Sequence, residues 1–304
     1  CVDSLKLVNN LFGIDPPRPM GPLVEMVGPI IPREHPPLTE DLRQFLETHH
    51  RIAYVAFGQH FSPTLEDTEL ILAVLLENIE LGALDGFIWA NPAPKFPPYI
   101  TTSSNKAYNV AELLEQTNTY GRVISWAPQY AVLRHPTTVM FVTHGGLGSL
   151  YEALFAGKRT MVFPIAFDQF SNAIMVEHNH LGRRFKREMS KSEATQALRN
   201  VALDSSGDIQ ANVERYKALV QIHSKRGTER GADLVEEVAF TNRNGKLPHR
   251  YEASREMTFV KAHNLDLYFV LALIIASPIN RPKVVMERRW ICEQQRDSKK
   301  DVVV

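Results

Sequence analysis

A short run of glycines in the middle of the chain suits the binding of a phosphorylated ligand. Residues 144–149 read His-Gly-Gly-Leu-Gly-Ser, and Glu152 follows them. Glycines allow a phosphate group to approach the backbone, and the free N–H groups at a helix N-terminus attract anions. If a helix begins here, the run predicts an anion site of the size of a phosphate group.

The flanking elements would place this site at the edge of a sheet. Residues 138–143 are apolar and β-branched, which is typical of a buried strand, and residues 150–156 have helical spacing. Gly157 and a second apolar strand, residues 160–163, precede the pair Asp168-Gln169. The pattern predicts a βαβ unit with an anion site at its first turn and polar side chains at its second.

The spacing from Trp126 to Gln169 resembles the donor-binding motif of the UDP-glycosyltransferases, glycosyltransferase family 1. That motif reads W-x-P-Q, L-x-H-P, T-H-G-G, S-x-x-E-A, G, P and D-Q. The matching residues here are Trp126, Pro128, Gln129, Leu133, His135, Pro136, Thr143, His144, Gly145, Gly146, Ser149, Glu152, Ala153, Gly157, Pro164, Asp168 and Gln169. Chance agreement at this many positions is negligible.

The resemblance implies a role for each polar position. Trp126 would be the flat surface on which uracil stacks, and Gln129 would lie near the uracil and the ribose. Glu152 would accept hydrogen bonds from both ribose hydroxyls, because a carboxylate offers two acceptor oxygens. Asp168 and Gln169 would bind the hydroxyls of the sugar.

The resemblance also implies a diphosphate site. His144, Ser149 and the N–H groups of residues 146–149 would hold the diphosphate, and the turn at Gly58 would touch it. Family members have Ser-Phe-Gly-Ser at that turn, whereas residues 56–59 read Ala-Phe-Gly-Gln and lack the hydroxyl. The predicted site comprises Gly58, Trp126, Gln129, His144, Gly145, Gly146, Gly148, Ser149, Glu152, Asp168 and Gln169.

Each of these residues has a simpler interpretation when it is taken alone. Trp126 could be a core residue, Glu152 could lie on a solvated helix face, and His144 could be a structural histidine. The joint spacing favours the binding site over all three. His135 keeps the structural interpretation, since nothing in its chemistry demands a ligand.

Composition narrows the class of protein. The 304 residues are 44% hydrophobic, enough for a full core and for two domains. Lys+Arg and Asp+Glu each total 34, so no basic face for nucleic acid is indicated. Cys1 and Cys292 give neither a disulfide framework nor a zinc-binding spacing, and there is no Asp-x-Asp motif. We expect no cofactor and no metal; the UDP-sugar would be a co-substrate.

Apolar strands alternate with helices along most of the chain. The predicted strands are residues 24–27, 52–57, 86–90, 122–126, 138–143 and 160–163. The predicted helices are residues 39–48, 64–81, 108–116, 150–156, 172–181, 190–202, 208–225 and 229–241. Thr39 would cap the first helix, and capping boxes would begin those at Thr64 and Ser190. This rhythm predicts an α/β fold with a Rossmann-like, doubly wound parallel sheet. The resemblance identifies it as the C-terminal domain of a GT-B glycosyltransferase.

The resemblance also suggests how the chain is divided. Residues 1–32 are Pro-rich and are similar to the end of the family's N-terminal acceptor domain with its linker. Residues 33–245 would form the UDP-sugar donor domain, and residues 246–304 a C-terminal tail. Because the chain begins with Cys rather than Met, we expect it to be a piece of a longer protein.

An uncharged run at residues 267–280 occurs where membrane-bound family members begin their single membrane anchor. It has 14 residues, about 21 Å of helix, whereas a span needs roughly 20 residues. Two interpretations stand: a shortened anchor, and a buried terminal helix. We therefore expect association with a membrane, such as the endoplasmic reticulum, with a cytoplasmic location as the alternative.

The resemblance implies inverting transfer of a hexosyl group from a UDP-sugar to an acceptor hydroxyl, such as that of a sterol, a lipid or another small lipophilic alcohol. The family's catalytic base belongs to the N-terminal domain, so we assign no catalytic residue and expect the chain alone to be inactive. Two alternatives remain: a UDP-sugar-binding module without turnover, and the donor subunit of a two-chain transferase.

Overall fold

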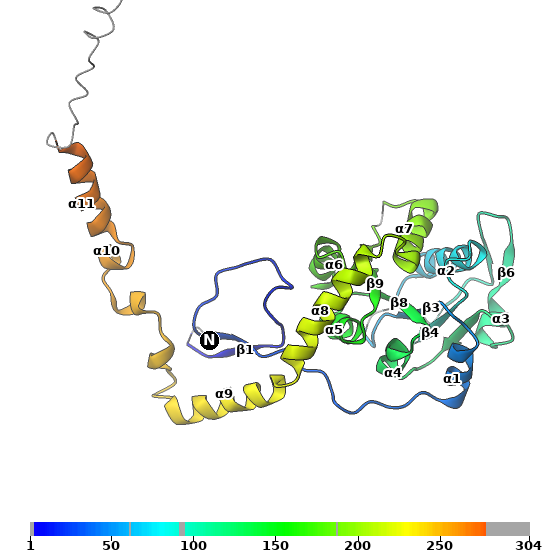
Figure 1. The fold of residues 1–304 in the computed structure, drawn as a ribbon, viewed down its shortest axis with the longest axis horizontal. Coiled ribbons are helices and arrows are strands. Elements are labelled where there is room, and N and C mark those ends of the chain that lie inside the picture. Colours follow the sequence, from blue (N-terminus) through cyan, green and yellow to red (C-terminus); the bar gives the residue numbers. More distant parts are fainter. Residues whose placement is uncertain (1–2, 61, 91–94, 187, 278–304) are drawn as a thin grey trace, which may run out of the picture. The chain divides into compact units, whose positions relative to one another are not determined.

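The computed structural model describes residues 3–60, 62–90, 95–186 and 188–277. The chain divides into two compact units, residues 1–246 and 247–304. The first unit is built on one parallel sheet with helices on both faces (Figure 1).

The central sheet has six strands in the order β10-β9-β8-β3-β4-β7, and every neighbouring pair is parallel. The strands are β3 (Ile52–Ala56), β4 (Gly86–Ala90), β7 (Gly121–Ile124), β8 (Thr138–Thr143), β9 (Arg159–Val162) and β10 (Gly182–Arg184). The chain builds outward from β3 to β7 on one side and from β8 to β10 on the other. The doubly wound sheet is therefore confirmed, and its switch point lies between β3 and β8.

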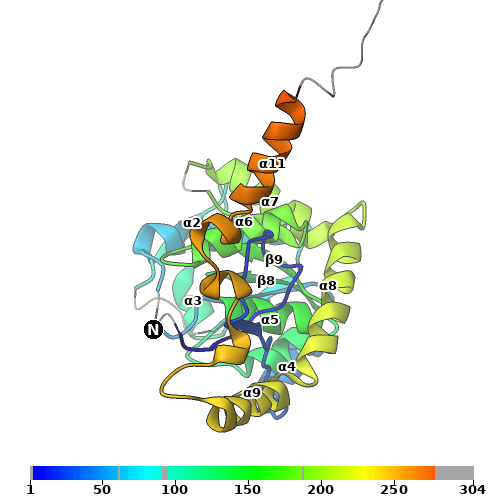
Figure 2. The same ribbon diagram turned by 90° about the vertical axis from the view of Figure 1, so that its left-hand side faces the viewer.

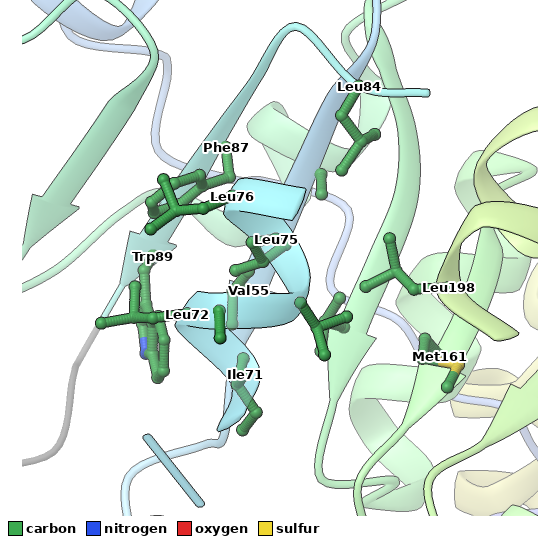
Figure 3. Packing of buried hydrophobic residues seen from close by; sticks show 14 of the residues in the cluster. Val55, Ile71, Leu72, Leu75, Leu76, Leu84, Phe87, Trp89, Met161 and Leu198 are labelled. Carbon is green, nitrogen blue, oxygen red and sulfur yellow. The ribbon is translucent and has the colours of Figure 1, made fainter. Parts of the chain in front are cut away.

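Alternation along each strand divides the core into two faces. Val55 points toward α2 (Leu65–Glu80) and α7 (Lys191–Leu203), as Figure 3 shows for the side chains around it. Its neighbour Tyr54 points the other way, toward α1 (Glu40–Glu47), α4 (Gln129–Arg134) and α5 (Leu147–Ala156). Both faces are covered, so the strands are buried on both sides, which is why they read as continuous apolar runs.

Hydroxyl caps fix the starts of three helices, as predicted. Thr39 accepts a hydrogen bond from the N–H of Leu42 at the start of α1. Thr64 and Ser190 form reciprocal capping boxes with Asp67 and Glu193 at the starts of α2 and α7. Each cap satisfies a backbone donor that the helix itself leaves without a partner.

Burial of α2 covers more of the helix surface than a single apolar stripe. Its buried residues are Thr68, Ile71, Leu72, Ala73, Val74, Leu75, Leu76, Glu77 and Asn78. The reason is that α7 packs against α2 as well as against the sheet. Polar side chains of α2 that face α7 are buried together with their partners: Glu77 accepts from the Thr195 hydroxyl, and Asn78 donates to the Thr195 carbonyl.

Four short strands are absent from the sequence-based prediction. One is β1 (Lys6–Val8), which pairs with the predicted strand 24–27. β10 extends the sheet beyond β9, and β5 (Tyr99–Thr101) pairs with β6 (Ala107–Asn109) in an antiparallel hairpin. The predicted helix 108–116 is therefore shorter: α3 covers Val110–Leu114, and Asn109 caps it. Strands of three residues carry too little periodic pattern to be recognised locally.

The N-terminal segment is anchored on the sheet unit. β1 (Lys6–Val8) pairs in parallel with β2 (Val24–Met26). Between them, Leu11 and Ile14 are buried in a cluster with α5, α6 (Gln169–His178) and α8 (Asp208–Ser224). Asn179 donates a hydrogen bond to the Ile14 carbonyl at 2.8 Å. Helix α8 lies beside α5 in both views (Figure 1, Figure 2).

Helix α9 (Gly227–Thr241) ends the first unit, and the second begins with the short helices η1 (Pro248–Arg250), η2 (Ala253–Glu256) and α10 (Phe259–Ala262). The predicted apolar run forms α11 (Leu265–Ala276), on which large apolar side chains such as Phe269 and Ile275 are exposed. Residues 278–280 of that run lie outside the described residues. Within the described part of the chain, no helix has both the length and the apolar character needed to cross a bilayer.

A buried carboxylate joins α2, α7 and the loop before β6. Glu77 accepts hydrogen bonds from the N–H and hydroxyl of Ser103 at 2.8 and 2.7 Å and from the Thr195 hydroxyl at 2.5 Å. Burial raises the pKa of Glu77, but these hydrogen bonds and the nearby Lys191 together lower it by more, so the net pKa lies below its usual value. Its contribution to stability is therefore complete above the unfolded pKa and is lost as pH falls through the lower folded pKa.

We predict that Glu77→Gln lowers the free energy of unfolding by about 1–3 kcal/mol at pH 7, because buried donors lose a charged acceptor. The difference from the wild type should shrink as pH falls below about 4, where the wild-type carboxylate becomes protonated. Urea unfolding followed by circular dichroism would measure both. Glu69→Gln, on the exposed side of α2, is the control. A loss that is equal in both variants would contradict the role of Glu77.

Candidate functional site

A cavity of about 570 Å³ opens at the carboxyl ends of β3, β4 and β7, beside α4 and α5. Five of the predicted residues line it: Gly58, Trp126, Gln129, Ser149 and Glu152. They come from three separate segments of the chain and meet at the switch point of the sheet, where ligands bind in doubly wound folds.

A hydrogen bond joins two predicted nucleotide contacts. The Gln129 side-chain nitrogen donates to a Glu152 carboxylate oxygen at 2.7 Å and lies 3.4 Å from the Ser149 hydroxyl. Gln129 is the first residue of α4, and Glu152 lies in the second turn of α5. The bond fixes the orientation of the carboxylate, and with it the positions of both carboxylate oxygens. Glu152 is therefore a wall of the cavity and not a solvated helix residue.

Trp126 presents its indole on the surface of the cavity. It follows β7 by two residues and is 57% exposed, whereas Trp89 in β4 is fully buried in the core. Exposure of so large an aromatic side chain at a cavity is what a stacking surface requires. The alternative of a core tryptophan is therefore wrong for Trp126 and holds for Trp89.

Glycines allow the turns after β3 and β8 to pack against one imidazole. A Cβ on Gly146 would lie 2.4 Å from His144 Nε2, and a Cβ on Gly58 would lie 3.1 Å from His144 Cε1. Gly145 adopts a left-handed φ of +87°, where a side chain would also collide with Val162. Any larger residue at Gly146 would displace the His144 ring, so the glycine run is a steric requirement of this turn.

The N-terminus of α5 differs from the capped helices of the same sheet. Gly146 occupies its N-cap position, and no side chain among the described residues caps it. The N–H groups of Leu147, Gly148 and Ser149 lie in the first turn, where a helix has no internal acceptors for them. Such groups, together with the helix dipole, can bind an anion, so the predicted diphosphate site at this helix start stays a prediction.

His144 is buried, and its electrostatics are those of a neutral side chain. Burial lowers the pKa of His144, while Asp168 and a hydrogen bond to the Ala56 backbone oppose this shift in part. The net pKa lies below the ordinary value, so the imidazole is uncharged at pH 7 and can donate a hydrogen bond from one nitrogen. A neutral histidine would add a hydrogen-bond donor to the predicted anion site and would not require a permanent counterion.

The second predicted pair lies at the start of α6. Asp168 is exposed, and its carboxylate accepts a hydrogen bond from Asn172 at 2.8 Å. Asn172 also donates to the Gly145 carbonyl at 2.9 Å, so it links the Asp168 carboxylate to the glycine turn. The Gln169 side chain is buried, and its oxygen accepts from the N–H groups of Ile165 and Ala166. Gln169 thus holds the turn that presents Asp168, and contact of either with a sugar stays a prediction.

Sequence reasoning missed several residues that line the cavity. His35 stacks on Tyr130 with ring centroids 3.6 Å apart, and both line the cavity together with Tyr54. Burial, with Glu152 nearby, raises the pKa of Tyr54, which therefore stays protonated. Tyr54 lies within a fully buried strand and His35 in a Pro-rich segment, so nothing in the sequence around either residue indicates a binding site. Among the described residues, no group of three or more His, Cys, Asp or Glu side chains is arranged to hold a metal.

The family model described as UDP-glucoronosyl and UDP-glucosyl transferase matches residues 2–295. UDP-glycosyltransferase 1 of Phaeomoniella chlamydospora is 33% identical over 290 residues, which cover 90% of this chain and 58% of that protein. Human UDP-glucuronosyltransferase 1A3 is 27% identical over 276 residues, or 90% of this chain and 47% of that protein. The chain thus spans about half the length of these relatives.

Solved structures share the fold. Phytolacca americana UGT2, complexed with UDP-2fluoro-glucose and pterostilbene, is 20% identical with a TM-score of 0.54 over 71% of this chain and 47% of that one. Arabidopsis thaliana UGT89C1, complexed with UDP-L-rhamnose, is 21% identical with a TM-score of 0.54 over 70% of this chain and 51% of that one.

We predict that UDP raises the pKa of His144, because a bound diphosphate favours the charged imidazolium. An NMR pH titration of the imidazole signals, with His144→Gln to assign the resonance, would measure the shift. Uridine, which lacks phosphate, is the matched control and should leave the pKa unchanged. An equal shift with uridine, or none with UDP, would separate His144 from the phosphate site.

Proposed function

The chain belongs to the family of UDP-glucoronosyl and UDP-glucosyl transferases, and from this we propose that its first unit binds the UDP-sugar donor of an inverting hexosyl transfer. The observation that carries the proposal is the hydrogen bond between Gln129 and Glu152, in one cavity with the exposed indole of Trp126. Uracil stacks on the indole, and the ribose hydroxyls donate to the Glu152 carboxylate.

In the proposed reaction an acceptor hydroxyl attacks the anomeric carbon of the sugar, and UDP leaves from the opposite face. Negative charge then develops on the diphosphate. The N–H groups of the first turn of α5 and the neutral His144 stabilise this charge, because they are already oriented before the reaction. A general base takes the proton of the hydroxyl. We assign the base to no residue of this chain, so we propose that the chain alone binds UDP-sugar without transferring it.

The acceptor in this proposal is a small lipophilic alcohol such as a sterol or a lipid. We also propose that the protein associates with a membrane, that of the endoplasmic reticulum. The exposed apolar side chains of α11 support this part of the proposal. The donor sugar is a hexose. Titration calorimetry with UDP, UDP-glucose, UDP-glucuronate and UDP-N-acetylglucosamine identifies it as the sugar that adds most affinity to UDP.

We predict that Glu152→Ala weakens UDP binding by about 1–3 kcal/mol, because two ribose hydroxyls lose a charged acceptor. Calorimetry on the folded variant would measure the change. Glu69→Ala removes an exposed carboxylate from α2, outside the cavity, and should bind UDP as the wild type does. Unchanged affinity in Glu152→Ala would remove this carboxylate from the site and, with it, the main support for the proposed function.

We also predict that Trp126→Ala weakens UDP by about 1–3 kcal/mol, the usual contribution of stacking one base on an aromatic side chain. Trp126→Phe should retain most of the affinity, because it keeps an aromatic face. The exposed Tyr99 of β5 provides the control, since Tyr99→Ala removes an aromatic ring that does not line this cavity. Equal affinities for Trp126→Ala and Trp126→Phe would rule out stacking.

A further inference from the structure

A second cavity, of about 600 Å³, lies on the other side of Tyr130, between the linker, α4, the end of α5 and α8. Four of its lining residues are cations: Arg33, Arg134, Lys217 and Lys225. The lining residues include no carboxylate. Such a concentration of one charge sign in a concave surface attracts anions.

The charges of the cavity are only partly balanced. Arg33 pairs with Glu229 at 3.1 Å, and Lys217 pairs with Glu214 at 3.0 Å. Both carboxylates lie outside the lining. In the described part of the chain, no ion pair is formed by Arg134 or Lys225. Two of the four positive charges therefore remain for a ligand, which matches a dianion.

A buried lysine nearby interacts with one of these cations, Lys217. Lys158 follows the end of α5, and its amine donates a hydrogen bond to the His135 carbonyl at 3.0 Å. Its pKa is lowered to about 8, first by burial and then by the charges of Lys217 and Arg159. The carbonyl of Phe155, at the end of α5, accepts a hydrogen bond from Gln221, which reduces the repulsion that a helix C-terminus exerts on an anion.

The remaining wall of the cavity is apolar and aromatic. Ile31, Pro32, Tyr130 and Phe155 line it, and the Arg134 guanidinium lies 5.8 Å from the centre of the Tyr130 ring. A guanidinium held over the face of a ring still has its N–H groups for bidentate contact with phosphate or carboxylate. We propose that this cavity binds a phosphate monoester dianion carried on an apolar or aromatic body, at Arg134 and Lys225.

This site is separate from the nucleotide cavity. Of the lining residues only Tyr130 belongs to both, and neither Glu152 nor Trp126 lines the second. A ligand there can be bound together with UDP. Binding of the monoester does not depend on the proposed function, since it requires neither uracil stacking nor the glycine turn.

The test is calorimetry of phenyl phosphate on the whole chain, both free and saturated with UDP. We expect one binding site in each case, and a loss of at least about tenfold in affinity in Arg134→Gln/Lys225→Gln, since two charged contacts are removed. Arg215→Gln removes a cation from α8 that does not line the cavity and should bind like the wild type. Phenol, which lacks the charge, should bind far more weakly. If the double variant fails to fold, Lys225→Gln alone should show the loss.

Equal affinity in the double variant and the wild type would overturn the proposal, as would displacement of phenyl phosphate by UDP or equal binding of phenol. Failure to bind UDP would count against the proposed function only. A second arm distinguishes a soluble ester from a lipid headgroup: flotation with phosphatidylcholine vesicles that contain phosphatidic acid. Greater retention of the wild type than of the double variant assigns the site to a lipid headgroup, and equal retention assigns it to a soluble ester.

Discussion

The close packing of two glycine turns against the His144 ring is the constraint on which the site depends. Parallel pairing brings the carboxyl ends of β3 and β8 to the same edge of the sheet. The chain leaves β3 toward one side and β8 toward the other, so a gap opens between their connections. A Cβ on Gly146 would collide with the imidazole and one on Gly58 would crowd it, so the two glycines let the start of α5 face that gap.

The electrostatics of the site follow from this packing. At the starts of α1, α2 and α7, a hydroxyl side chain accepts a hydrogen bond from a backbone N–H of the first turn. Helix α5 starts at a glycine, and no side chain among the described residues caps its first N–H groups. The imidazole beside them is neutral because it is buried. An anion bound at this helix start would therefore contact hydrogen-bond donors and the positive end of the helix dipole, and it would need no permanently charged side chain.

The two cavities beside Tyr130 are chemically different although they share its ring. The first contains the carboxylate of Glu152, an amide and an exposed indole, which suit a neutral base and a ribose. The second has four cations and an apolar wall, which suit an anion with an apolar body. The difference arises because α4 directs Gln129 to one side, at its start, and Arg134 to the other, at its end.

The sequence by itself determined the α/β class, the succession of the long strands along the chain, the capped helix starts and the spacing of the glycine turn. These depend on local periodicity and on residues whose backbone preferences act within a few positions. Only the tertiary structure decided that Gln129 bonds to Glu152, that Tyr54 and His35 line the same cavity, and that Gln169 supports the turn before Asp168. It also decided the wide burial of α2 from Ile71 to Asn78 and the pairing of β10 with β9. Such features join segments far apart in the chain, and their geometry is set by how helices and strands pack, which no local pattern encodes.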